Sequence, residues 1–197
     1  MTDHNHYGGD PGSLLSVSYP NAQLSDLVLT IENRRRLWNV VMEQRQWDKI
    51  TFHGLQPVRR LLFTGPPGTG KTSTAQALAG ELGVPLYTVR LDLLTTQPKD
   101  EGEAEFRQVL DTLRQTYGVF VFDGVAEFTE ENRWILVMLQ QFLMQDTSKS
   151  VIIVASNRPR LLDGVIFEQC DRIVNFGLPT SDEARAIIAE PDRKSVV

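Results

Sequence analysis

The sequence predicts an α/β fold in which a parallel sheet is covered by helices on both faces. Short, almost continuous apolar runs alternate along the chain with segments whose apolar residues recur at helical spacing. Strands that are apolar throughout are typical of parallel sheets buried on both faces. The chain has 197 residues, which is long enough for one such domain with a short appended segment.

Two segments precede the first predicted core strand. Residues 1–20 are polar and rich in Gly, Pro and Ser, which predicts a disordered N-terminal arm. Residues 21–58 predict a helical lead-in, because apolar side chains recur at helical spacing from Ile31 to Met42. The arginine run at 34–36 could suggest phosphate or nucleic-acid contact, but in an acidic chain we interpret it as a solvated helix face.

The predicted core spans residues 59–190 and alternates strands with helices. Strands are expected at residues 60–65, 85–91, 119–123, 150–156 and 172–177. Helices are expected at residues 70–83, 101–118 and 130–145, the third of them capped by Thr129. Thr180 and Glu183 form a capping box in front of a short helix that Pro191 ends. Residues 191–197 are expected to form a C-terminal tail.

The bulk composition excludes several functional classes. The formal net charge of −5 and a pI of about 5.2 give the chain no general attraction to nucleic acid or anionic lipid. Cys170 is the only cysteine, which excludes an intrachain disulfide and a four-cysteine metal site and fits a reducing compartment. No apolar run approaches the ~20 residues of a membrane helix, and the N-terminus lacks the apolar core of a signal peptide. We expect a cytoplasmic protein with no membrane or nucleic-acid partner.

The stretch GPPGTGKT, residues 65–72, matches the pattern G-x-x-x-x-G-K-[ST] in full and lies between a predicted strand and a predicted helix. Its glycines let backbone N–H groups point at phosphate oxygens, and the positive end of the following helix adds attraction. Lys71 is expected to reach the β- and γ-phosphates of a nucleotide, and the Thr72 hydroxyl to ligate Mg²⁺. The alternative is a glycine-rich turn that binds nothing. The predicted nucleotide-binding residues are Gly65, Pro66, Pro67, Gly68, Thr69, Gly70, Lys71, Thr72 and Ser73.

Asp123 ends the apolar strand VFVFD and is the second predicted magnesium ligand. Ligands of open α/β sheets bind at the carboxyl ends of the strands, where the phosphate-binding stretch is also expected. The alternative role for Asp123 is the cap of a turn or helix.

Taken together, GPPGTGKT, VFVFD and VIIVASNRPRLLD (residues 151–163) resemble the AAA family of ATPases. The resemblance covers roughly residues 24–190 and is closest to bacterial members with a short helical lead-in. It implies a P-loop NTPase fold, which is a three-layer α/β/α sandwich around a five-stranded parallel sheet. The strand that leads into GPPGTGKT, the phosphate cradle, is expected at the centre of this sheet. It also implies ATP and Mg²⁺ as cofactors, and a ring assembly that couples ATP turnover to moving a protein partner. In the family, the asparagine that matches Asn157 lies between the metal-binding acid and the γ-phosphate and helps to place the attacking water, so the expected catalytic residues are Lys71, Asp123 and Asn157.

The chain departs from the family directly after Asp123. Gly124 stands where the family has its catalytic glutamate, and glycine has no side chain that could polarise water. The chemical step is therefore expected to lose a contribution of ~10²–10⁴-fold. Glu127, three residues further on, is a candidate substitute, and its alternative role is a surface acid at the start of a helix.

Three other elements of the family pattern also differ. Phe167 and Gln169 occupy the positions expected for arginine fingers, whose charge can contribute ~10³–10⁵ in rate. In the region of the substrate-gripping pore loop, the pair Gly102–Glu103 is kept, but residues 99–101 (Lys, Asp, Glu) replace the aromatic residue. The sequence ends at Val197, about where the family's small helical lid begins, so we expect this lid to be absent or truncated.

These observations lead to two hypotheses. The first is an ATP-binding AAA-type ATPase module that binds Mg-ATP, hydrolyses it slowly and couples its ATP or ADP state to a protein partner. The second, favoured by the four departures, is a hydrolysis-deficient ATP-binding switch or scaffold subunit. A small-molecule kinase would need an acceptor pocket and lid arginines, which makes it the weaker alternative. We expect that the isolated chain forms no stable closed hexamer, although an AAA-type oligomer with other subunits fits the family.

Overall fold

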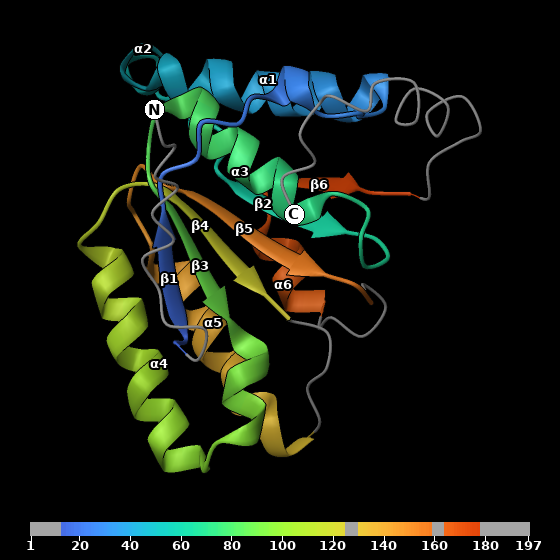
Figure 1. Cartoon of the computed structure of the whole chain (residues 1–197). Coiled ribbons are helices and arrows are strands. Elements are labelled where there is room, and N and C mark those ends of the chain that lie inside the picture. Colours follow the sequence, from blue (N-terminus) through green and yellow to red (C-terminus); the bar gives the residue numbers. More distant parts are fainter. Residues whose placement is uncertain (1–12, 125–129, 159–163, 178–197) are drawn as a thin grey trace, which may run out of the picture.

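A six-stranded sheet in the order β1-β3-β4-β5-β2-β6 runs through the computed structural model (Figure 1). The structure describes residues 13–124, 130–158 and 164–177. The strands are β1 (Leu15–Ser18), β2 (Arg60–Thr64), β3 (Leu86–Arg90), β4 (Val119–Asp123), β5 (Val151–Ser156) and β6 (Arg172–Asn175).

Five strands, β3, β4, β5, β2 and β6, are mutually parallel, which confirms the predicted parallel sheet. Their carboxyl ends therefore meet along one edge of the sheet. All six residues of β5 are buried, as expected for a strand with helices on both faces. β2, which leads into the GPPGTGKT stretch, lies between β5 and β6, so it is one strand in from the edge and not at the centre.

The sixth strand, β1, was not predicted and pairs antiparallel with β3 at the opposite edge of the sheet. Its residues belong to the segment expected to be a disordered arm, and that expectation is wrong for residues 14–18. Leu14 is only 1% exposed, and its carbonyl accepts a hydrogen bond from the Arg90 backbone N–H (3.0 Å). An uncovered edge of β3 would present unpaired backbone groups, and β1 satisfies them. Residues 1–12 lie outside the described part of the chain.

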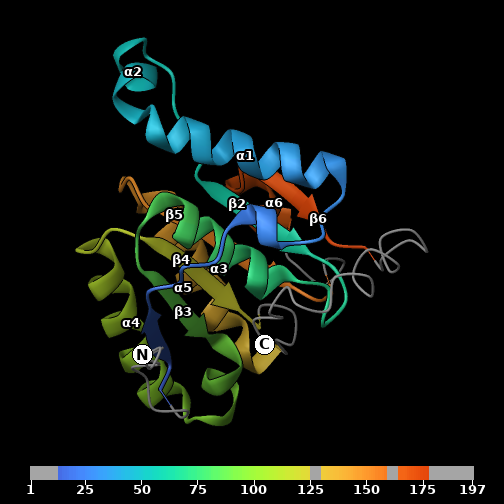
Figure 2. The same ribbon diagram turned by 45° about the horizontal axis from the view of Figure 1, so that its top comes forward.

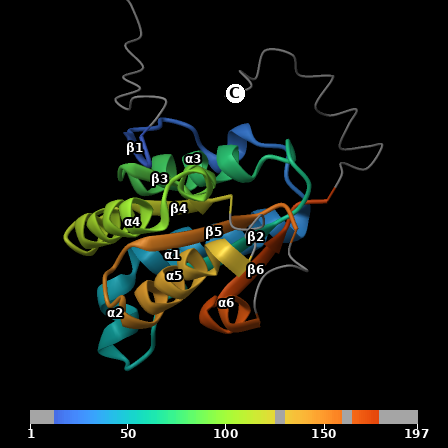
Figure 3. The ribbon, with the colours of Figure 1, turned by 90° about the horizontal axis from the view of Figure 1, so that it is seen from below.

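Helices cover both faces of the sheet, which confirms the predicted three layers (Figure 3). α1 and α3 pack on one face, and α4, α5 and α6 pack on the other. α2 follows α1 at the end that projects beyond the sheet (Figure 2). In the described part of the chain, no helix has the length and apolar character needed to cross a bilayer. The helices are α1 (Ile31–Arg45), α2 (Trp47–Phe52), α3 (Lys71–Leu82), α4 (Lys99–Arg114), α5 (Arg133–Gln145) and α6 (Gly164–Gln169), with 3₁₀ turns η1 (Leu24–Asp26), η2 (Leu91–Thr96) and η3 (Glu130–Asn132).

The core is divided by the sheet into two apolar clusters. Alternate residues of each strand face opposite sides, so β4 contributes Phe120 and Phe122 to the cluster under α4 and α5. The same strand contributes Val119 and Val121 to the cluster under α1 and α3. Each of these side chains is at most 3% exposed. Burial of such a side chain contributes about 1.5–3 kcal/mol, so both faces of β4 hold Asp123 in place at its end.

A buried ion pair and two carboxylate–backbone hydrogen bonds join β2, α5 and β6 at the end of the sheet remote from the carboxyl edge. The Arg59 guanidinium, directly before β2, donates to the Asp146 carboxylate and to its backbone carbonyl (2.6 Å), and both residues are under 8% exposed. The Asp171 carboxylate, directly before β6, accepts hydrogen bonds from the backbone N–H groups of Arg59 (3.0 Å) and Arg60 (2.9 Å).

Burial, with the neighbouring Asp171 charge, raises the pKa of the Cys170 thiol to about 12. That thiol is therefore protonated at neutral pH and unreactive.

Candidate nucleotide-binding site

The predicted phosphate-binding loop leaves the carboxyl end of β2 and enters α3 directly. Gly65 is a position where only glycine fits, because a Cβ there would lie 2.0 Å from the Phe176 carbonyl oxygen. Gly70 is the N-cap of α3 and has a φ of 95°, which favours glycine. A Cβ at Gly68 or Gly70 would meet no atom of the described residues within 4 Å, so the space at these two positions is open. The first N–H groups of α3 have no intrahelical acceptor and face this space with the positive end of the helix dipole.

Lys71 is held over this loop by two backbone carbonyls. Its Nζ donates to the carbonyl oxygens of Gly65 (2.7 Å) and Pro66 (2.8 Å), and the residue is 8% exposed. Burial lowers the pKa of Lys71, and attraction by the Asp123 carboxylate acts in the opposite direction. These two hydrogen bonds hold the ammonium group over the loop. This geometry fits phosphate oxygens as its ligands.

Thr72 and Asp123 supply oxygen atoms that fit Mg²⁺. Thr72 is the second residue of α3 and is exposed, whereas Asp123 is partly buried at the end of β4. Asp123 Oδ1 accepts a hydrogen bond from the Gly124 N–H (2.8 Å), which leaves Oδ2 for another partner. Mg²⁺ typically takes one or two protein oxygens and completes its octahedron with phosphates and water. The residues present therefore fit a magnesium-nucleotide complex.

Asn157 directly follows β5, which lies between β4 and β2. The topology therefore brings it to the carboxyl edge of the sheet, between Asp123 and the loop that precedes α3. Asn157 is exposed, and the next residue is fixed by a hydrogen bond from the Arg158 N–H to Ser156 Oγ (3.2 Å). An exposed amide at this position is available to a phosphate or a water molecule.

Gly124 has a φ of 84°, in the left-handed region that side chains rarely adopt. A Cβ at this position would lie 3.1 Å from the Asp92 backbone N and 3.4 Å from Asp92 Cβ. The family's glutamate is thus missing from the sequence, and the backbone is also shaped for glycine. Glu127, the suggested substitute, lies outside the described residues, and its role stays a prediction.

Arg90 and Asp92 lie beside the candidate site, which the sequence did not reveal. Arg90 is the register partner of Asp123 across β3 and β4, and its Nη2 donates to Asp92 Oδ2 (2.8 Å). The hydrogen bond and charge of Asp92, with a smaller contribution from Asp123, raise the pKa of Arg90. The available signal was their position at the end of the strand PLYTVRL, but only the pairing of β3 with β4 places them next to Gly124.

The lead-in helix is attached to the cradle edge through a polar network that was also missed. Asn33 of α1 donates through Nδ2 to the Asn175 carbonyl (2.8 Å), and Arg36 donates to the Ile173 carbonyl (2.7 Å). The Thr64 hydroxyl, just before the cradle, donates to Asn175 Oδ1. Thr30 caps α1 by accepting from the Asn33 N–H (3.1 Å). These bonds fix α1 to β6, and β6 to the end of β2.

Two departures from the family pattern have structural counterparts. The partly buried side chain of Phe167 packs against the core cluster under α4 and α5, so this position serves packing. The pair Gly102–Glu103, which the resemblance places in the region of the pore loop, lies in the helix that was predicted from residue 101, and α4 begins two residues earlier, at Lys99. A Cβ on Gly102 would lie 3.3 Å from the Trp134 ring of α5. The expected pore loop is therefore the packed first turn of a helix, and Asp100 and Glu101 favour helix formation at its N-terminus.

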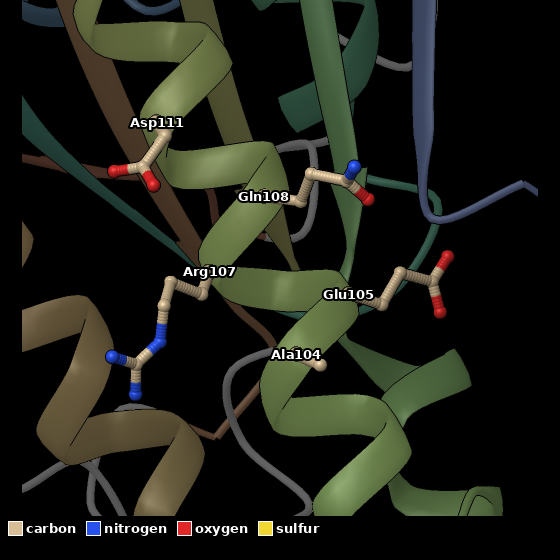
Figure 4. A pocket seen from close by; sticks show the side chains of 5 residues that line it. All are labelled: Ala104, Glu105, Arg107, Gln108 and Asp111. Carbon is tan, nitrogen blue, oxygen red and sulfur yellow. The ribbon is translucent and has the colours of Figure 1, made fainter.

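A hollow on the outer face of α4 lies apart from the cradle (Figure 4). Its lining side chains all come from this one helix. Arg107 in this hollow donates to Glu103 one turn earlier (2.9 Å), so its guanidinium is engaged in an ion pair. We assign no ligand to this surface. The lining residues are Ala104, Glu105, Arg107, Gln108 and Asp111.

The sequence profile of the "ATPase family associated with various cellular activities (AAA)" matches residues 61–178, more than half of the chain. The chain therefore belongs to the AAA family of ATPases, whose members are ATP-binding modules that generally use ATP with Mg²⁺.

Several relatives show the same affiliation. The chain is 33% identical over 169 residues to an uncharacterized AAA family ATPase, y4kL, of Sinorhizobium fredii, covering 81% of this chain and 51% of that protein. It is 29% identical over 196 residues to the ATP-dependent zinc metalloprotease FtsH 3 of Sphaerobacter thermophilus, covering 91% and 40%. It is 36% identical over 129 residues to the ribosome biogenesis ATPase RIX7 of Saccharomyces cerevisiae, covering 57% and 15%. The chain thus spans about half or less of the length of these relatives.

Proposed function

We propose that this chain binds Mg-ATP in the cradle after β2, hydrolyses it slowly and couples its nucleotide state to a protein partner. The observation that carries the proposal is the buried Lys71 ammonium, which two loop carbonyls hold over an open loop at the start of α3. A lysine in this position is pre-oriented for β- and γ-phosphates, so little ordering is required when the nucleotide binds.

Each predicted residue then has a distinct role. Backbone N–H groups of the loop and of the first turn of α3 donate to the phosphates, and Lys71 binds the β- and γ-oxygens. Thr72 and Asp123 hold Mg²⁺, which neutralises charge on the phosphates when it is bound. Asn157 donates to the γ-phosphate or the attacking water from between these groups. Together these residues position the nucleotide, and positioning is the largest part of catalysis in phosphoryl transfer.

Slow turnover follows from the groups that are replaced. Gly124 removes a water-orienting side chain, at a cost of ~10²–10⁴ in rate. Phe167 and Gln169 provide no cation for a neighbouring site, where an arginine contributes ~10³–10⁵. Among the residues that the family pattern predicts, the cradle, Asp123 and Asn157 are kept and supply acceleration. ATP is therefore expected to stay bound for a long time before it is hydrolysed.

The second candidate is a hydrolysis-deficient ATP-binding switch or scaffold subunit. The left-handed backbone of Gly124 favours it, because this conformation is incompatible with the family's glutamate without strain. In such a protein ATP would order the domain for a partner, and hydrolysis would not reset it.

The coupling to a protein partner rests on the family and on the relatives. FtsH 3 is named as an ATP-dependent zinc metalloprotease and RIX7 as a ribosome biogenesis ATPase. For this chain, the partner and the cytoplasmic location that the composition favours remain proposals.

Steady-state phosphate release from Mg-ATP decides between the two candidates. The wild-type chain is expected to release phosphate slowly but above the background set by Lys71→Ala. Saturable ATP binding without release above this background would favour the switch. Absence of both binding and release would contradict the cradle assignment itself.

A further inference from the structure

The place beside Asp123 where the family has a carboxylate is adjacent to another carboxylate in this chain. A Cβ on Gly124 would approach Asp92 Cβ to 3.4 Å and the Asp92 backbone N to 3.1 Å. These are contact distances, so the Asp92 side chain starts next to the position from which a side chain at 124 would start. Asp92 is thus an acid of the described chain that the fold brings directly to the end of the metal-binding strand.

The fold fixes Asp92 at this place. β3 runs parallel to β4 with Arg90 opposite Asp123, so the residues after β3 emerge at the same edge as Gly124. The chain then turns into η2, where Leu91 and Leu94 are fully buried and anchor the turn. The Thr95 hydroxyl donates to the Asp92 carbonyl (2.7 Å), which closes the turn around this residue.

The Asp92 carboxylate is oriented but still open to water. Arg90 Nη2 donates to its Oδ2 (2.8 Å), while the two side chains remain 45% (Arg90) and 47% (Asp92) exposed. In many active sites, a nucleophile is activated by a base that accepts its hydrogen bond, and another side chain orients this base. Arg90 orients the Asp92 carboxylate in the same way. Oδ1 of Asp92 can accept a hydrogen bond from a water molecule at the same time, because each carboxylate oxygen has two lone pairs.

We propose that Asp92, oriented by Arg90, accepts the hydrogen bond that positions the attacking water, in place of the glutamate that Gly124 lacks. This role rests on the proposed ATP hydrolysis. The water oxygen forms a bond to the γ-phosphorus, and the bond from that phosphorus to the bridging oxygen breaks with its electron pair on ADP. The proton of the water passes to an oxygen of the transferred group, so the products are ADP and inorganic phosphate. Asp92 directs the water and is not consumed.

Single-turnover hydrolysis of Mg-ATP, measured together with equilibrium ATP binding, tests this role with Asp92→Asn. The rate is expected to fall roughly 10²-fold or more, with ATP affinity within about twofold of wild type, because the residue does not contact the cradle. Asp111→Asn is the matched control, since Asp111 is also an exposed aspartate paired with an arginine (2.8 Å to Arg114) but lies on α4. It should leave rate and affinity unchanged.

The pair Asp92→Glu and Asp92→Gln keeps the test decisive if Asp92→Asn does not fold. The two differ only in the carboxylate, so the glutamate variant should hydrolyse ATP faster than the glutamine variant. Equal rates, or a wild-type rate in Asp92→Asn, would overturn the role of Asp92 and leave the proposed hydrolysis intact. A wild-type chain that binds ATP without turnover above Lys71→Ala would overturn both. Loss of binding in Asp92→Asn with an unchanged bound-state rate would also contradict the role.

Discussion

Gly124→Ala tests whether the left-handed backbone after Asp123 is a requirement of the native structure. The φ of 84° costs a residue with a Cβ roughly 1–2 kcal/mol. Alanine would regain ~0.4–1 kcal/mol by restricting the unfolded chain, but its Cβ would also crowd the Asp92 backbone N at 3.1 Å. The expected net loss in the free energy of unfolding is about 1 kcal/mol. For a chain of this size, 1 kcal/mol lowers Tm by about 2–4 °C.

Two other glycines separate the contributions in the same thermal or urea unfolding experiment. Gly83→Ala carries a positive φ of 66° with no atom within 4 Å of the new Cβ, so it measures the backbone strain alone. Gly164→Ala has neither feature and should be neutral or slightly stabilising. We expect the loss of stability to be largest for Gly124→Ala and smallest for Gly164→Ala. Equal stability of these two variants would refute the reasoning.

The same strain determines what Gly124→Glu does to hydrolysis. The new carboxylate would start in the strained conformation next to Asp92, which is also acidic. We therefore expect phosphate release no faster than wild type. Release accelerated ~10²-fold or more would show that the backbone relaxes to the family geometry.

The remaining predictions concern charge, stability and assembly. Burial lowers the pKa of Lys71 below 10.5, so ATP affinity should weaken as the pH rises through that lowered pKa. The affinity of Lys71→Arg should not depend on pH in this range, because arginine stays charged. The same pH profile of ATP affinity in both proteins would contradict this prediction. Between the lowered pKa of Lys71 in the folded chain and its ordinary value of 10.5, Lys71 is protonated in the unfolded chain but not in the folded one. In the absence of ATP, Lys71 therefore makes the free energy of unfolding rise with pH over this range. Asp146→Ala should lower the free energy of unfolding by about 3–5 kcal/mol, because it leaves the Arg59 charge buried without its carboxylate. The exposed-pair control Arg107→Ala should change it by under ~1 kcal/mol. Sedimentation of the wild-type chain should show no closed hexamer with or without ATP, and ATP-dependent hexamers would refute this.

The loop between β2 and α3 could be predicted from sequence because its determinants are contiguous. Gly65 to Thr72 form the loop by themselves, and the apolar strand before it and the helix after it both fall where the pattern requires. The parallel strands could be predicted for the same reason, since a strand that is apolar on both faces carries that information locally.

Features that depend on pairing between distant segments could not be predicted. Asp92 approaches Gly124 only through the register of β3 with β4, and the sequence does not state that register. β1 is polar enough to be read as an arm, but it is ordered because the edge of β3 offers it backbone partners. The close approach of the Trp134 ring to Gly102 is a contact between α4 and α5, which the sequence does not state.

Isothermal titration calorimetry of Mg-ATP binding to the wild-type chain and to Lys71→Ala tests the central claim most directly. Hydrogen bonds to a charged group are worth ~1.5–3 kcal/mol, which corresponds to about 10- to 150-fold in affinity at ~1.4 kcal/mol per factor of ten. The account predicts saturable binding at one site in the wild-type chain. In Lys71→Ala it predicts an ATP affinity that is at least about 10-fold weaker. Equal affinity in the two proteins, or no binding by the wild-type chain, would contradict it.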